Sequence, residues 1–74
     1  MTPEQEKRLT SELSFYAGED VRTEQINATF YAYGSEIAVL RIFAKYLSNG
    51  AVASDKYRIG YSTIEKCFFF AIHN

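Results

Sequence analysis

The sequence predicts a small α+β domain in which two helices pack on a mixed three-stranded sheet, in the order α-β-α-β-β. Two segments repeat apolar residues at the spacing of a helix, and three segments carry the alternating or aromatic-rich pattern of strands. Polar or glycine-containing turns separate these segments. Because 74 residues can build only one hydrophobic core, residues 1–74 are expected to form a single domain.

The first helix is expected over residues 3–17. Thr2 can cap its N-terminus, and the proline that follows suits the first helical position. One face carries the apolar side chains of Leu9, Leu13 and Tyr16. Gly18 is a typical helix end, and the polar stretch 19–25 is interpreted as a connector that can hold a short turn.

A half-buried strand is expected over residues 26–34, and a second helix over about 36–48. The strand alternates, so that Phe30 points to one side and both Tyr31 and Tyr33 point to the other. The helix is apolar around most of its circumference, with only a narrow polar arc. Phe30 and Leu40 are predicted to be among the most buried residues.

Two further strands are expected at residues 56–62 and 66–73, joined by a hairpin turn near residues 63–65. These two strands should be antiparallel. The strand-helix-strand order of residues 26–62 predicts a right-handed crossover that makes the first two strands parallel neighbours.

Residues capable of catalysis are sparse. Cys67 and His73 are the nucleophile and base that an enzyme could pair, but six residues of strand separate them by roughly 20 Å. No phosphate-binding glycine motif and no pair of metal ligands at helical spacing is present. We therefore expect a protein that is not an enzyme and that uses no metal and no cofactor.

Composition and charge suit a cytoplasmic protein with a protein partner. The single cysteine suits a reducing compartment, and the longest apolar run, "CFFFAI", is too short to span a membrane. Eight basic and nine acidic residues leave a net charge of −1, without the overall positive charge of many nucleic-acid-binding proteins. No membrane partner is expected.

Six tyrosines and six phenylalanines exceed what so small a core can readily bury. If both helices cover one face of the sheet, the other presents an aromatic platform; if one helix covers each face, the aromatics are core. The platform would use Tyr31, Tyr33, Phe69 and Arg58, and perhaps Tyr57 or Tyr61, with Arg41 and Lys45 as further partner-binding candidates. Val39, Ile42 and Tyr46 are candidates for a homodimer interface, since dimerisation often completes the core of a small chain.

The segments "YGSEIAVLRIFAKY" and "YRIGYSTIEKCFFFAI", within residues 30–72, resemble a pattern of small accessory proteins from bacteriophages and other mobile elements. The resemblance implies a class of role, binding and disabling host defence machinery as anti-CRISPR proteins do, and assigns no functional residue. A phage-encoded protein of this class would act in the cytoplasm of the host cell.

The leading hypothesis is a binding protein that inhibits or modulates a host nucleoprotein complex by steric occlusion. One alternative is a single-stranded nucleic-acid-binding module that stacks bases on the same aromatic face, although the net charge of −1 counts against it. Another is a small homodimeric interaction protein.

Overall fold

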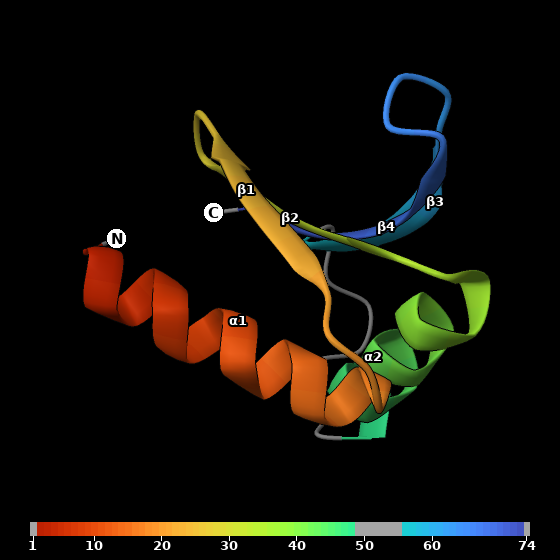
Figure 1. The fold of residues 1–74 in the computed structure, drawn as a ribbon, viewed down its shortest axis with the longest axis horizontal. Coiled ribbons are helices and arrows are strands. Elements are labelled where there is room, and N and C mark those ends of the chain that lie inside the picture. Colours follow the sequence, from red (N-terminus) through yellow and green to blue (C-terminus); the bar gives the residue numbers. More distant parts are fainter. Residues whose placement is uncertain (1, 49–55, 74) are drawn as a thin grey trace.

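The computed structural model describes residues 2–48 and 56–73. Six elements follow one another along the chain (Figure 1). They are the helix α1 (Pro3–Ala17), the strands β1 (Arg22–Ile26) and β2 (Thr29–Gly34), the helix α2 (Glu36–Ser48), and the strands β3 (Tyr57–Ser62) and β4 (Cys67–His73). The predicted α+β class is confirmed, but the order is α-β-β-α-β-β and the sheet has four strands.

Both helices begin and end at the residues that the sequence predicts. At the start of α1 the Thr2 hydroxyl accepts a hydrogen bond from the Gln5 backbone N–H at 3.2 Å, and the Gln5 side chain accepts one from the Thr2 backbone N–H at 2.9 Å. This reciprocal pair is a capping box, which satisfies two otherwise unpaired N–H groups. The helix ends at Gly18, whose φ of 76° is in the left-handed region that glycine adopts without strain.

The stretch predicted to be a connector contains an additional strand. β1 pairs with β2 as an antiparallel hairpin, in which Arg22 lies opposite Tyr33 and Ile26 lies opposite Thr29. Its sequence, "RTEQI", is mostly polar because β1 is an edge strand whose side chains are largely exposed. The turn at residues 27–28 places Asn27 at a φ of 55°, a conformation that asparagine tolerates better than most residues.

The sheet order is β1-β2-β4-β3, and every neighbouring pair is antiparallel. The predicted hairpin between β3 and β4 is confirmed, whereas the predicted pairing of β2 with β3 is wrong. These two strands do run in the same direction, but β4 lies between them and pairs with both. The crossover through α2 therefore leaves a gap of one strand, which the C-terminal strand fills.

Both helices cover the same face of the sheet (Figure 1), and this decides between the two arrangements that the sequence leaves open. We call this side the inner face and the opposite side the outer face. The core lies between the inner face and the helices. Its fully buried members come from both helices and from the two central strands, and include Leu13, Ala17, Ala32, Ala38, Ile42 and Phe70.

The rotation of α2 about its axis differs from the prediction. Phe30 is buried as expected, with 2% of its surface exposed, but Leu40 is 48% exposed. The helix faces the sheet with Ala38, Val39 and Ile42, and Leu40 lies about 100° or more away from these residues around the helix. Because the helix is apolar on nearly every side, hydrophobic pattern alone does not select the side that packs.

The same rotation corrects the predicted dimer surface. Val39 and Ile42 are buried beneath the sheet, and Tyr46 packs against Phe70 and Tyr57 with ring centroids 5.0 and 5.1 Å away. Val39 and Ile42 complete the core of a single chain and are therefore not available to a second copy, whereas Tyr46 is only partly buried. The large apolar residues of α2 that are exposed are instead Ile37, Leu40 and Leu47.

Candidate functional site

The outer face of the sheet is the surface that neither helix covers. Strand register places on it every second residue of each strand. Its central strands contribute Thr29, Tyr31, Tyr33, Cys67, Phe69, Ala71 and His73, and its edge strands contribute Arg22, Glu24, Ile26, Arg58, Gly60 and Ser62. The sheet curves, and the turns β1–β2 and β3–β4 both rise on the side away from the helices (Figure 1).

Three aromatic side chains form a cluster on this face. The rings of Tyr31 and Tyr33 stack at 6.0 Å between centroids, and the Phe69 ring meets Tyr31 edge to face at 5.6 Å. Phe69 has room to lie flat because its cross-strand neighbour is Gly60, where an added Cβ would come within 2.9 Å of the ring. The predicted grouping of Tyr31, Tyr33 and Phe69 on one face is therefore confirmed.

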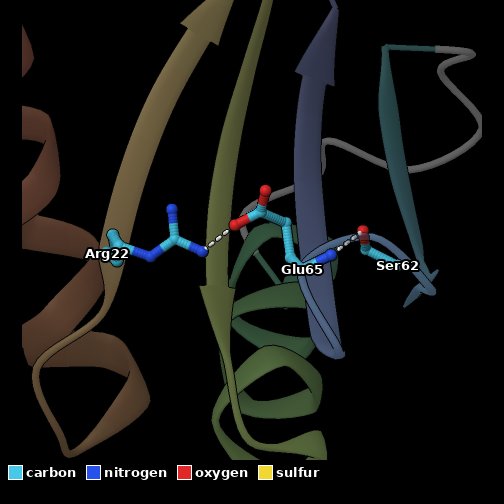
Figure 2. A network of polar contacts seen from close by, with 3 residues as sticks. All are labelled: Arg22, Ser62 and Glu65. Carbon is cyan, nitrogen blue, oxygen red and sulfur yellow. Dashed lines mark hydrogen bonds and ion pairs between the residues drawn. The ribbon is translucent and has the colours of Figure 1, made fainter.

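An ion pair closes one end of the cluster. The Arg22 guanidinium lies 4.4 Å from the centre of the Tyr33 ring and pairs with the Glu65 carboxylate from the β3–β4 turn (Figure 2). The Glu65 backbone N–H donates to the Ser62 hydroxyl at 3.0 Å, which fixes the turn. The hydrogen bond to Glu65 raises the pKa of Arg22, so the guanidinium keeps its charge.

Tyr33 is less accessible than its position at the end of a strand predicts. Only 7% of its surface is exposed, because Arg22 covers the ring and Tyr31 stacks on it. Burial is also the main reason that the pKa of the Tyr33 hydroxyl is raised. Tyr31 and Phe69 are half-buried and form the accessible part of the cluster.

The cluster forms one wall of a hollow of about 430 Å³, which we call the aromatic hollow. It is lined by Glu24, Ile26, Tyr31, Tyr33, Tyr61, Ser62, Thr63, Ile64, Glu65 and Phe69. The two charged residues among them, Glu24 and Glu65, are both acidic, and Glu65 is already engaged by Arg22. The hollow therefore combines aromatic faces with a carboxylate from β1 at its rim.

The other predicted partner-binding residues do not join this cluster. Arg58 lies on the outer face but opposite Ala71, where it lines a different hollow. Arg41 donates a hydrogen bond at 3.2 Å to the carbonyl of Ala17, and Lys45 lies 5.5 Å from the centre of the Tyr16 ring. Both therefore contact α1 from α2, on the side of the sheet opposite the aromatic hollow.

The two further tyrosines considered for the platform belong to the inner face. Tyr57 stacks at 6.0 Å on Phe70, and Tyr61 meets Phe68 edge to face at 5.0 Å. Tyr61 is 53% exposed because it lies near the end of edge strand β3, so its atoms also reach the rim of the aromatic hollow.

Sequence reasoning missed Arg22, Glu24 and Glu65, which set the charge and the shape of the aromatic hollow. Arg22 and Glu24 fell in the presumed connector, and only the pairing of β1 with β2 brings them beside Tyr33 and Tyr31. The alternation of "RTEQI" was the available signal, since it places both charges on the same side of a strand.

The nucleophile and the base that an enzyme could pair lie far apart in the structure. Cys67 and His73 stand at the two ends of β4, as their spacing predicts. Within residues 2–48 and 56–73, no three His, Cys, Asp or Glu side chains lie close enough together to hold a metal ion. None of the helices described here is long and apolar enough to cross a membrane.

Comparison with protein families, curated proteins and solved structures found no match to this chain. The chemistry of the outer face therefore provides the argument for function.

Proposed function

We propose that this chain is a non-enzymatic binding protein that inhibits or modulates a host defence nucleoprotein complex by steric occlusion. The aromatic hollow is the contact site in this proposal, and the single observation that supports it is the uncovered aromatic cluster with an acidic rim. The protein would act as a phage-type accessory protein in the cytoplasm of the host cell.

The lining of the hollow favours a partner segment that carries arginine or lysine. A cation that approaches Tyr31 or Phe69 over the ring face is attracted by the π-electrons, and the Glu24 carboxylate lies beside Tyr31 across the β1–β2 pair. Tyrosine and phenylalanine also provide large apolar area on rigid side chains. A basic segment with apolar neighbours would satisfy all of these groups.

This chemistry connects the hollow with a nucleoprotein complex. Grooves that hold nucleic acid are lined with arginine and lysine, because these residues neutralise phosphates. A small protein that offers carboxylates and aromatic faces can occupy such residues and exclude the nucleic acid without any chemical turnover. Binding alone is then sufficient for inhibition.

The same charges disfavour the alternative in which the hollow itself stacks unpaired bases. A nucleotide held entirely within the aromatic hollow, with its base on Tyr31, would place its phosphate near Glu24, and like charges repel. The net charge of −1 adds no long-range attraction for a polyanion. A protein partner is therefore the better supported occupant.

A peptide titration tests the chemistry of the hollow. The probes are a labelled peptide of alternating arginine and leucine and a peptide of equal length with glutamate in place of arginine. We expect the arginine peptide to bind and Tyr31→Ser or Glu24→Gln to weaken it by about tenfold or more, as for an interface anchor. Phe15→Ser and Glu4→Gln are matched controls on α1, where Phe15 is 81% exposed.

Three results would contradict the proposal. These are equal affinity for both peptides, no loss in the Tyr31→Ser and Glu24→Gln variants, and the same loss in the two controls. Tight, salt-sensitive binding of a single-stranded oligonucleotide that depends on Tyr31 would favour the nucleic-acid alternative instead.

Capture from a bacterial lysate, followed by mass spectrometry, tests the identity of the partner. The proposal expects a nucleic-acid-binding complex that is retained by the parent protein and by Phe15→Ser but lost with Tyr31→Ser. A retained set that is unaffected by Tyr31→Ser would contradict the use of this face.

A further inference from the structure

A second hollow, of about 260 Å³, lies on the outer face and shares no residue with the aromatic hollow. It is lined by Thr29, Lys56, Arg58, Ala71 and His73, and we call it the basic hollow. Its floor is open because the small Ala71 side chain lies between Tyr31 on one neighbouring strand and Arg58 on the other. Longer side chains at the strand ends form the walls.

The charge of the basic hollow is the opposite of that of the aromatic hollow. Among the described residues that line it, Lys56, Arg58 and His73 are basic in type and none is acidic. The acidic residue of the outer face nearest in register is Glu24, which lies on β1, two strands away from Ala71. Among the described residues, none accepts a hydrogen bond or forms an ion pair with the Arg58 guanidinium.

Two contacts fix the positions of the basic groups. The Thr29 hydroxyl and the Nδ1 atom of His73 are hydrogen-bonded at 2.8 Å, which orients the imidazole at the edge of the hollow and leaves Nε2 without a hydrogen bond among the described residues. The His73 backbone N–H donates to the Lys56 carbonyl at 2.7 Å, which holds the residue before β3 beside the end of β4. The donors therefore come from three strand ends that are tied together.

We infer that the basic hollow binds a phosphate group. The planar guanidinium of Arg58 can donate two parallel hydrogen bonds to phosphate oxygens, and the His73 side chain lines the same hollow from the end of β4. A phosphate offers more acceptor oxygens than a carboxylate, so it can accept hydrogen bonds from Arg58 and His73 together. The sequence predicts that Arg58 belongs to the same platform as the tyrosines, but its side chain lines this separate hollow.

Two sources could supply the phosphate, namely the free ion and a mononucleotide. Tyr31 is the direct cross-strand neighbour of Ala71, so a planar base attached to the phosphate would lie near its ring. Such a ligand would reach from the basic hollow towards the aromatic cluster, whereas the free ion would occupy the basic hollow alone.

A titration of the intact protein, monitored through its amide chemical shifts in NMR, tests the inference. The probes are inorganic phosphate, adenosine 5′-monophosphate and acetate, all at one ionic strength. We expect saturable shifts at Arg58, Ala71 and His73 with phosphate but not with acetate. A mononucleotide that binds at least tenfold more tightly and also shifts Tyr31 identifies a nucleotide ligand, and equal affinity identifies the free ion; both results support a phosphate site.

Variants distinguish a specific phosphate site from general electrostatic attraction. Arg58→Gln and His73→Gln should each weaken phosphate binding, Arg58→Gln by about tenfold or more, because a charge-assisted hydrogen bond is lost. Arg41→Gln removes the same charge from the opposite side of the sheet and should leave the affinity unchanged. Both Arg58 and His73 are exposed, so thermal melting should show folded variants.

The inference is overturned if phosphate gives no saturable shift, if acetate binds equally well, or if Arg41→Gln weakens binding as much as Arg58→Gln. It does not depend on the proposed function, because Tyr31→Ser should leave the binding of inorganic phosphate intact while it weakens the arginine peptide. Failure of one site can therefore be distinguished from failure of the other.

Discussion

Of the aromatic residues in the four strands, five lie on the inner face and three on the outer face, and the two faces differ in what covers them. On the inner face, Phe30 and Phe70 are sealed by two helices and have at most 2% of their surface exposed. On the outer face, Tyr31, Tyr33 and Phe69 cover one another, and a single ion pair from an edge strand and a turn lies across one end. The inner face stabilises the fold, whereas the outer face keeps aromatic surface available.

The largest expected effect compares neighbouring phenylalanines on opposite faces. Phe70→Ala should lower the free energy of unfolding by about 3 to 5 kcal/mol, because the ring is fully buried among Phe43, Tyr46 and Tyr57. Phe69→Ala should cost clearly less, since its ring is half-buried. Urea unfolding of the two variants measures the difference, and equal losses would contradict the division between the faces.

The second largest expected effect is a loss of folding stability at alkaline pH, caused by a tyrosine packed on the inner face. Burial raises the pKa of Tyr46 to about 12, above the value of 10 for an exposed tyrosine. Because the folded protein holds this proton more tightly than the unfolded chain, the stabilisation is complete below pH 10 and is lost as the pH rises towards 12. The loss is at most about 2 to 3 kcal/mol and is reduced by solvent screening.

Tyr46→Phe separates this titration from those of lysines in the same range. The variant lacks the ionising hydroxyl, so its stability should fall less steeply between pH 10 and pH 12 in urea unfolding. Parallel curves for the parent and the variant would show that Tyr46 is not the group responsible.

A smaller effect is expected from the ion pair on the outer face. Arg22 and Glu65 are partly exposed, and such pairs contribute about 0 to 1 kcal/mol, which decreases at high salt. A double-mutant cycle of Arg22→Gln and Glu65→Gln should give a coupling energy within that range. A coupling well above 1 kcal/mol would mean that the pair helps to hold the β3–β4 turn in place.

The smallest effect is expected at Leu40, which the sequence placed in the core. Leu40→Ala should change the free energy of unfolding by about 0.5 kcal/mol or less, since the side chain is 48% exposed. Ile42→Ala, two residues away and fully buried, is the matched comparison and should cost about 2 to 5 kcal/mol. Similar losses in both variants would contradict the observed rotation of α2.

The contrast between the faces also explains which elements the sequence could predict. The helices α1 and α2 were predicted with their observed bounds, because caps and glycine mark their ends locally. The alternation of β3 and β4 was predicted for the same reason, as was the placement of Tyr31 and Tyr33 on the same side of β2. Each of these features depends on residues close together along the chain.

The features that escaped prediction depend on pairing between distant segments. β1 carries too few apolar residues to stand out, and its strand character comes from hydrogen bonding to β2. Likewise, the predicted neighbour of β2 is wrong. No residue of β2 or β3 indicates that β4 lies between them and pairs with both. The acidic rim follows from these pairings, since Glu24 lies in β1 and Glu65 in the β3–β4 turn.

The insertion of β4 between β2 and β3 has a consequence for the time course of folding. The strand that completes the centre of the sheet is β4, the last of the described strands. It pairs with β2, so that Ile72 lies opposite Phe30 and His73 lies opposite Thr29. Until it docks, β2 and β3 each lack their common neighbour. Contacts this distant in sequence form slowly, so this protein should fold more slowly than a helical bundle of equal length, with docking of the final strand as the late cooperative event.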